Sequence, residues 1–117
     1  MSDIALNVKM KKATIRFSDT TAKNLFTLPK NAFVMYFLVD VDTAFNGAGT
    51  DFLDLGKSGN ATYFANDVDV SAANQILVME SNLGDIGSSV IQVTGIYAGA
   101  ATAGLATVTC VYGHYST

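Results

Sequence analysis

The residues with the most obvious reactivity are the one cysteine, Cys110, and the one histidine, His114. A thiol becomes a nucleophile when a nearby base or positive charge favours its thiolate, so a Cys–His pair could support covalent catalysis. Both residues lie in the alternating segment 106–115, which predicts a β-strand. Four residues along a strand place two side chains on one face but about 13 Å apart, too far for a hydrogen bond. We therefore expect Cys110 to be a buried apolar residue and His114 to face solvent or a neighbouring subunit.

Paired carboxylates are the second chemical candidates. Three pairs stand out by their spacing: Asp40 with Asp42, Asp51 with Asp54, and Asp67 with Asp69. Two carboxylates can flank a glycosidic bond, and several oxygen ligands can hold calcium. None of the pairs lies in a loop with the regular ligand spacing of a calcium site, so solvated strand ends are the expected role. A hydrolase using Asp40 or Asp42 remains an alternative, although one His and one Glu offer few further titratable groups.

Metal and cofactor chemistry finds little support in the sequence. One cysteine cannot form an internal disulfide or a cysteine-rich metal site, and one histidine argues against a metal-binding double-stranded β-helix. Segment 51–58 ends in Gly-Lys-Ser like a phosphate-binding loop. However, the motif requires glycine where Asp51 stands, and it must open a helix. The sequence therefore predicts no catalytic residue, no metal site and no cofactor.

The elements that must position these residues are β-strands. Apolar alternation recurs along the chain and is interrupted at short intervals by clusters of Gly, Asn, Asp and Ser. This pattern predicts an all-β fold, an antiparallel β-sandwich or jelly roll with few or no helices, as a single domain over residues 1–117. Residues 1–24 form either an N-terminal arm or the first strands. A short helical turn is considered only within 65–74.

The expected strands can be given by their residue ranges. They are 4–10, 12–18, 25–28, 33–41, 51–55, 61–64, 75–80, 90–98 and 106–115. Apolar residues change face between the first two of these strands. We expect 56–60 to form the tip of a hairpin, and the last two strands to pair as an antiparallel hairpin across 99–105.

The strand expected at 33–41 is apolar on both faces. One face carries Phe33, Met35, Phe37, Val39 and Val41, and the other carries Val34, Tyr36 and Leu38. Such a strand requires cover on both sides. The core of the domain supplies one cover, and in a chain of 117 residues we expect another protein to supply the second.

Charge limits the partners of the chain. The net charge of −3 argues against nucleic acid as the main partner, because phosphate binding needs concentrated Lys and Arg. All seven basic residues lie between Lys9 and Lys57, and four of them lie close together within 9–16. This basic segment either complements a protein neighbour or guards a strand edge against aggregation.

No membrane partner is expected. The longest apolar run, 33–39, is far shorter than the roughly 20 residues that span a bilayer. The N-terminus lacks the basic start, apolar middle and cleavage site of a secretory signal. We expect synthesis and folding in a cytoplasm.

Several segments together resemble a known class of virion proteins. They are 28–35, 39–50, 52–57, 64–73 and the Gly/Ala/Thr-rich closing block 96–112, which ends in Val-Thr-Cys-Val-Tyr. The pattern resembles the small β-sandwich or jelly-roll head decoration (cement) proteins of tailed phages and related minor structural proteins. The resemblance implies a subunit, often trimeric, that sits on the capsid lattice and clamps neighbouring capsid proteins. It implies no catalytic residues.

The leading hypothesis is a non-enzymatic phage virion protein, made in the host cytoplasm and located on the capsid surface. Its partners would be further copies of itself, as a trimer, and the major capsid protein or another virion protein. The candidate subunit or capsid interface comprises Ile4, Leu6, Lys9, Lys11, Lys12, Arg16, Val34, Tyr36 and Leu38. The alternative is a carbohydrate- or receptor-binding β-module of a phage tail, fibre or baseplate. It would present Asn60, Tyr63 and Asp67 on a concave polar surface.

Overall fold

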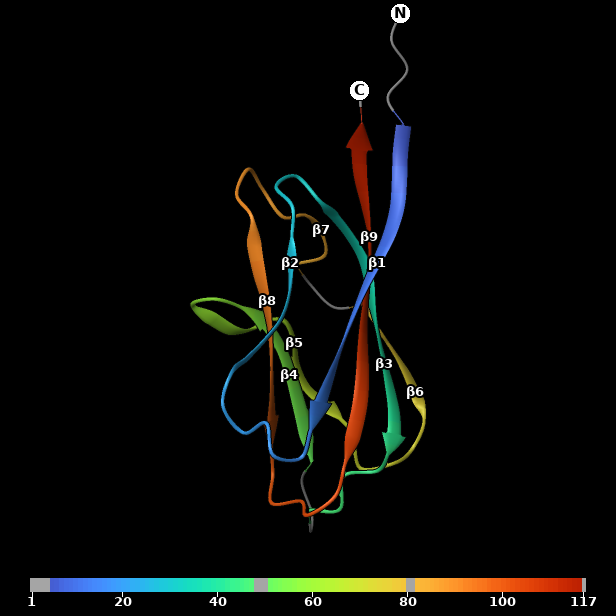
Figure 1. The fold of residues 1–117 in the computed structure, drawn as a ribbon, viewed down its shortest axis with the longest axis vertical. Coiled ribbons are helices and arrows are strands. Elements are labelled where there is room, and N and C mark those ends of the chain that lie inside the picture. The colour runs from blue at the N-terminus through green and yellow to red at the C-terminus, as the bar shows by residue number, and fades with distance from the viewer. Residues whose placement is uncertain (1–4, 48–50, 80–81, 117) are drawn as a thin grey trace, which may run out of the picture.

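The computed structural model describes residues 5–47, 51–79 and 82–116, which form two packed antiparallel sheets (Figure 1). The strands are β1 (Ala5–Arg16), β2 (Lys23–Leu28), β3 (Phe33–Thr43), β4 (Phe52–Lys57), β5 (Asn60–Asp69), β6 (Gln75–Val78), β7 (Gly84–Asp85), β8 (Ile91–Ala98) and β9 (Leu105–Ser116). Sheet A has the order β1-β9-β3-β6, with β7 also paired to β3, and sheet B has the order β2-β8-β4-β5. The all-β sandwich prediction is confirmed.

Helices are absent from the described ranges, which therefore contain none that could cross a membrane. The helical turn considered within 65–74 is wrong, because β5 runs on through Asp69 and residues 70–74 are not helical. The hairpin predicted at 56–60 is confirmed by the pairing of β4 with β5. Where two strands were expected near the N-terminus there is one, β1, paired with β9 from Ala5 to Arg16. The expected change of face occurs within this single strand, because Val8 and Met10 face away from sheet B and Ile15 faces the core.

The hairpin expected between the last two strands is wrong. β8 lies in sheet B between β2 and β4, whereas β9 lies in sheet A between β1 and β3. The connection between β8 and β9 crosses from sheet B to sheet A, and the loop before β4 holds it in place. The Asn46 side-chain oxygen accepts hydrogen bonds from the backbone amides of Thr102 (2.7 Å) and Ala103 (3.0 Å). Gly104 packs so closely on the Phe45 ring that a Cβ would collide with it.

A β-bulge in β3 changes which residues of this strand reach the core. β9 pairs Tyr112 with Val34 and Val111 with Tyr36, so Met35 is an extra residue that shifts the alternation by one position. Val34 is therefore 1% exposed and Phe33 is 42% exposed, the opposite of what simple alternation predicted. Beyond the bulge the predicted inner face is confirmed, because Phe37, Val39 and Val41 are buried.

The core lies between the two sheets and is bridged by aromatic side chains. The rings of Phe37 in β3 and Phe64 in β5 are 5.1 Å apart. At one end of the sandwich the Phe45 ring lies 4.8 Å from that of Tyr97. Lysine side chains join the edges of the sheets at β1 and β2, where Lys11 Nζ donates to the Thr27 carbonyl oxygen at 2.6 Å.

Candidate interaction surface

The Cys–His pair does not form a catalytic site. Cys110 is fully buried in the core, as predicted, and burial raises the pKa of its thiol to about 12 because the thiolate would lose its hydration; the nearby Lys11 charge opposes this only in part. His114 lies four residues on in β9, opposite Asn7 of β1. A buried neutral thiol without a base is not a nucleophile.

This burial makes the thiol of Cys110 unreactive in the native protein. The pKa rises from 9.0 to about 12, so the thiolate population at pH 8 falls by about 1,000-fold, and access is blocked as well. We expect a maleimide or disulfide reagent to label the folded protein at least about 1,000-fold more slowly than the same protein in denaturant. Labelling at similar rates in both states would contradict the buried position.

The carboxylates of Asp54 and Asp69, near β5, accept hydrogen bonds from neighbouring groups instead of forming a site. The Asp54 carboxylate accepts a hydrogen bond from the backbone amide of Asp67 at 2.8 Å. Asp69 accepts the amide and hydroxyl of Ser71, and these hydrogen bonds lower the pKa of the Asp69 carboxyl. Within the described ranges no group of three His, Cys, Asp or Glu side chains is arranged to hold a metal ion.

Asp51 is not the solvated strand end that was expected. It is 3% exposed, and its Oδ1 accepts the Gly47 amide at 3.0 Å and the Tyr97 hydroxyl. The Tyr97 oxygen in turn accepts the Ala101 amide at 3.1 Å. Burial, followed by the hydrogen bond to Asp51, raises the pKa of Tyr97. This network ties together the loops that flank Phe45, so its role is structural. Nothing in the sequence indicated that the Asp51 carboxylate would be buried, because it directly precedes an apolar strand.

A groove of about 560 Å³ runs between the open edges of β5 and β6. Asp67 lines this groove, but Asn60 and Tyr63 do not. Asn60 caps the hairpin tip by accepting the Thr62 amide, and the Tyr63 ring lies 4.0 Å beneath Lys57 Nζ. The three residues expected on one concave polar surface are therefore not brought together.

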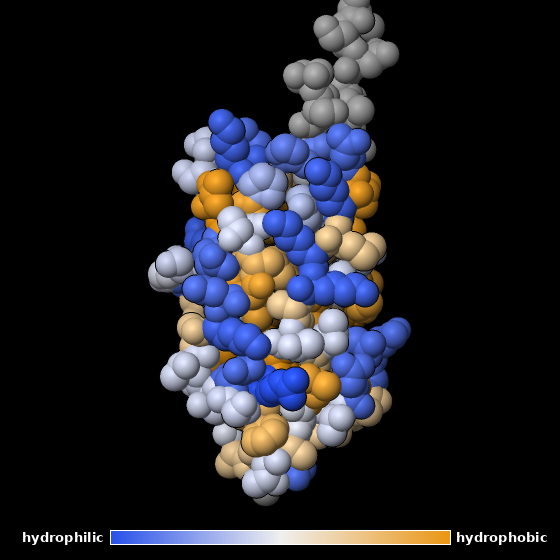
Figure 2. Space-filling view, in the orientation of Figure 1, coloured by the Kyte–Doolittle hydropathy of each residue, from blue (hydrophilic) through white to orange (hydrophobic). Residues whose placement is uncertain are grey.

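The outer face of sheet A, which points away from sheet B, carries most of the exposed apolar surface. Its apolar members, assigned from the strand register, are Val8, Met10, Phe33, Tyr36, Leu38, Leu77 and Val111. Seven large apolar side chains are exposed in the described ranges; four of them belong to this face, and a fifth, Met79, directly follows β6. In Figure 2 apolar surface shows at the right-hand margin, on the side of β3 and β6, and also at the upper left margin and between the polar side chains of the front.

The outer face of sheet A is continuous across its strands. One row runs from Lys12 through Thr109 and Leu38 to Leu77. Leu77 is 58% exposed, and Met10, in the adjacent row beside Val111, is 61% exposed. Scattered single apolar residues need no explanation, but a contiguous set on one sheet face is typical of an interaction site.

The structure separates the predicted interface residues into groups. Tyr36 and Leu38 lie on the outer face of sheet A, and alternation along β1 places Lys12 and Arg16 there too. Val34 does not belong to the outer face, because the bulge puts it in the core.

The remaining candidates on β1 lie elsewhere. Lys9 and Lys11 occupy the opposite face of the strand, and Lys11 is engaged with β2, so the basic segment is not one surface. Leu6 lies within β1, opposite Tyr115, and Ile4 lies outside the described residues. Sequence reasoning missed Val8, Met10, Leu77 and Met79; the apolar even positions of β1 were the available signal.

Three solved phage capsid structures contain chains that are similar to this one. A chain of the capsid asymmetric unit of cyanophage Pam1 has 20% identity and a TM-score of 0.74, over 92% of this chain and 85% of that chain. A chain of the acid-stable capsid of Helicobacter pylori bacteriophage KHP30 has 17% identity and a TM-score of 0.74, over 100% of this chain and 99% of that chain. A chain of the capsid of Ralstonia phage GP4 has 20% identity and a TM-score of 0.71, over 95% of this chain and 86% of that chain.

Sequence comparison adds nothing to this likeness, since no protein-family model and no curated protein matches the chain. The structural coverage is high on both sides, so each matched chain is close to this one in length. The protein therefore shares its whole sandwich fold with chains found in phage capsid structures.

Proposed function

We propose that this protein is a non-enzymatic structural protein of a phage virion, a decoration (cement) protein that binds the assembled capsid lattice and stabilises it. The observation that carries the proposal is the exposed apolar outer face of sheet A on an otherwise well-packed sandwich. Such a face gains free energy when another protein covers it, at about 25 cal/mol for each Å² of apolar surface buried. The likeness to chains of similar length in three phage capsids supports the virion context.

A decoration role suits the distribution of exposed apolar residues better than a shell-forming role. A subunit that closes a continuous shell must contact neighbours around its whole perimeter. Here the exposed apolar side chains concentrate on one face, as expected of a protein that attaches to a completed surface. The proposed partners are the major capsid protein and further copies of this chain, as a trimer. The proposed location is the capsid surface, after synthesis in the host cytoplasm.

Binding to undecorated capsids tests this function. We expect the purified protein to co-sediment with shells that lack it, to saturate at a fixed ratio to the capsid protein, and to raise the temperature at which the shells rupture. We expect half-saturation at or below about 1 μM, which corresponds to a binding free energy of about 8 kcal/mol. A natively folded protein that neither co-sediments at about 10 μM nor changes rupture would contradict the proposal.

One observation favours the alternative of a carbohydrate-binding module. The groove between β5 and β6 has a volume of about 560 Å³ and is lined by Asp67, Asp69 and Asn74, whose polar groups suit sugar hydroxyls. A glycan array probed with the native protein tests this function. Binding that is lost in Asn74→Ala, with the capsid experiment negative, would favour the module over the decoration protein.

A further inference from the structure

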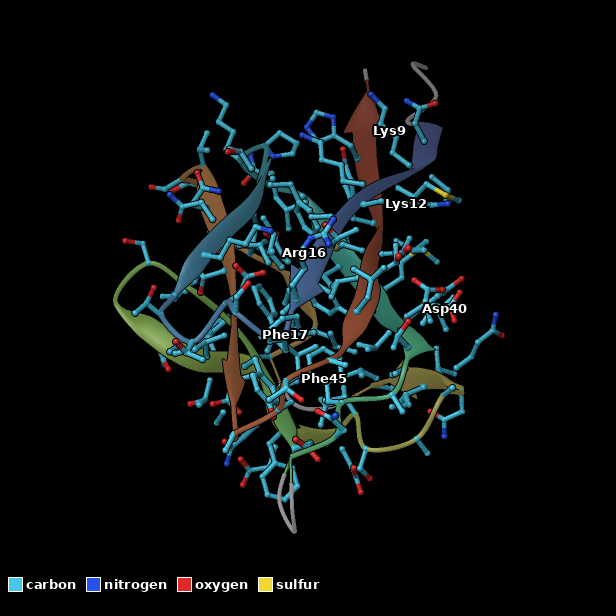
Figure 3. The ribbon with its side chains drawn as sticks, turned by 60° about the horizontal axis from the view of Figure 1, so that its bottom comes forward. Lys9, Lys12, Arg16, Phe17, Asp40 and Phe45 are labelled. Carbon is cyan, nitrogen blue, oxygen red and sulfur yellow. The ribbon has the colours of Figure 1, made fainter. Side chains whose placement is uncertain are left out.

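The loop after β3 contains a chemically labile pair of residues. Asn46 is followed by Gly47, and no other asparagine in the sequence precedes a glycine. Asparagine is thermolabile because the backbone nitrogen of the next residue can attack its side-chain carbonyl carbon. Glycine has no side chain to hinder that attack. Figure 3 shows the preceding residue, Phe45, at the end of the sandwich where the connection from β8 to β9 passes.

The fold favours an asparagine at position 46. Its Oδ1 accepts the backbone amides of Thr102 and Ala103, and its Nδ2 lies 3.1 Å from the Thr102 hydroxyl oxygen, to which it donates. An asparagine combines an acceptor and a donor in one short side chain. The backbone amide of Asn46 also donates to the Ala103 carbonyl oxygen at 3.3 Å. Asn46 therefore fastens the connection between the two sheets to the loop before β4.

The fold also requires a glycine at position 47. A Cβ there would collide with the Asp51 carboxylate, and it would lie 3.0 Å from the Tyr97 hydroxyl oxygen and 3.1 Å from the Ala100 nitrogen. This space is closed because the Gly47 amide donates to Asp51 Oδ1 at 3.0 Å and the Tyr97 hydroxyl donates to the same oxygen. Packing at this end of the sandwich thus brings the labile pair together.

We propose that Asn46 is a site of spontaneous deamidation, and that the opening of its contacts with Thr102 and Ala103 controls the rate. In the first step the Gly47 nitrogen forms a bond to the Asn46 Cγ atom and the Cγ–Nδ2 bond breaks. Ammonia leaves, taking up the proton of the Gly47 amide, and a succinimide ring remains. Water then opens the ring at either of its two carbonyl carbons and gives aspartate or isoaspartate. The reaction needs no partner other than water.

The closed structure hinders the first step. Attack requires the two reacting atoms to approach to about 3–3.5 Å in an aligned geometry. The Asn46 side chain is instead held towards Thr102 and Ala103, and the Gly47 N–H is directed at Asp51. These hydrogen bonds must break before the attack, in a local opening of the loop. Each typically changes an equilibrium constant about fivefold, so together they should slow the reaction about 100-fold or more.

The two products should affect the fold differently. An aspartate at position 46 keeps the length of the side chain, so its oxygens can still accept the amides of Thr102 and Ala103. Isoaspartate adds one carbon to the backbone and shortens the side branch, which removes the acceptor from these amides. Isoaspartate at position 46 therefore releases the connection from β8 to β9 beside Phe45.

Comparison with an unrestrained peptide tests the control of the rate. The purified protein and a synthetic peptide with the sequence of residues 43–50 are incubated under the same conditions, and peptide mapping by mass spectrometry follows the gain of one dalton at Asn46. We expect the protein to react at least about 100-fold more slowly than the peptide. Similar rates in the two would overturn the proposal.

Thr102→Val tests the contact directly. It removes the hydroxyl to which Asn46 Nδ2 donates, at an exposed position where the change in shape is small. We expect deamidation at Asn46 about fivefold faster than in the unmodified protein. Thr107→Val is the matched control, because the Thr107 hydroxyl donates to Asp42 on the outer face of sheet A, and it should leave the rate unchanged.

Tyr97→Phe loosens the same contact from the core side. It removes the hydroxyl that joins Asp51 to the Ala101 amide and keeps the ring that packs on Phe45. We expect deamidation about tenfold faster or more. The melting temperature shows that each variant is folded. Folded Thr102→Val and Tyr97→Phe proteins that react no faster than the unmodified protein would overturn control by these contacts.

The fate of the products is measured on the same material. The isoaspartate form, separated by chromatography, should melt below the unmodified protein, whereas Asn46→Asp should melt close to it. An isoaspartate form that melts like the unmodified protein would show that Asn46 does not fasten the connection, and would overturn that part of the proposal.

Discussion

Replacing Tyr36 and Leu38 together with serine should dissociate the oligomer and leave the sandwich folded. Both side chains lie on the outer face of sheet A, where Leu38 is opposite Leu77 and Tyr36 is opposite Val111. Full burial of side chains of this kind contributes roughly 1.5–3 kcal/mol each, and both are already half-buried in the single chain. We expect a combined loss of about 3 kcal/mol at each contact, which raises the dissociation constant by more than about 100-fold.

The measurement is native mass across a dilution series, with the melting temperature as a check on folding. Val90→Ser is the matched control, because Val90 is 61% exposed and lies next to β8 of sheet B. It removes exposed apolar area without touching the outer face of sheet A, so its oligomer should be unchanged. Intact trimers of the double variant at low concentration would exclude this face as the subunit contact.

Local alternation located most of the strands but did not assign them to sheets. The period of two in 90–98 and 106–115 correctly indicates β8 and β9. The same period fits two halves of a hairpin or two strands in opposite sheets equally well. The choice is made by contacts between distant residues, such as Asn46 with Thr102, which no local pattern contains.

The interaction surface was predictable only where alternation is unbroken. Leu38 was correctly placed opposite the core-facing Phe37, but the bulge at Met35 reversed the positions of Phe33 and Val34. A bulge adds one residue without a clear change in composition, so an apolar run on both faces hides it.

The extent of the surface depends on strand order. Met10 and Leu77 belong to one patch because β9 and β3 lie between their strands. They are separated by more than 60 residues in the sequence, so composition near either residue gives no sign of the other. The apolar positions of β1 could be recognised as an unusual feature, but their neighbours could not.

Replacing Phe45 with alanine should have the largest effect on stability. Phe45 is 1% exposed, closes one end of the core against the Tyr97 ring at 4.8 Å, and packs against Gly104. A buried Phe→Ala change costs about 3–5 kcal/mol because the lost transfer free energy adds to that of the cavity. Against a typical stability of about 5–15 kcal/mol, this change should lower the melting temperature by roughly 10–20 °C.

Phe17→Ala is the matched control, since Phe17 is 37% exposed and the same atoms are removed. Its expected cost is about 1 kcal/mol, because a ring that is already open to solvent on one side leaves no closed cavity. Urea unfolding measures both variants, with an unchanged slope against urea showing that the comparison concerns stability. Equal midpoints for the two variants would mean that Phe45 does not close the core. The Phe45 variant should still self-associate at low temperature, because the outer face of sheet A does not include this ring and the folded molecules keep that face intact.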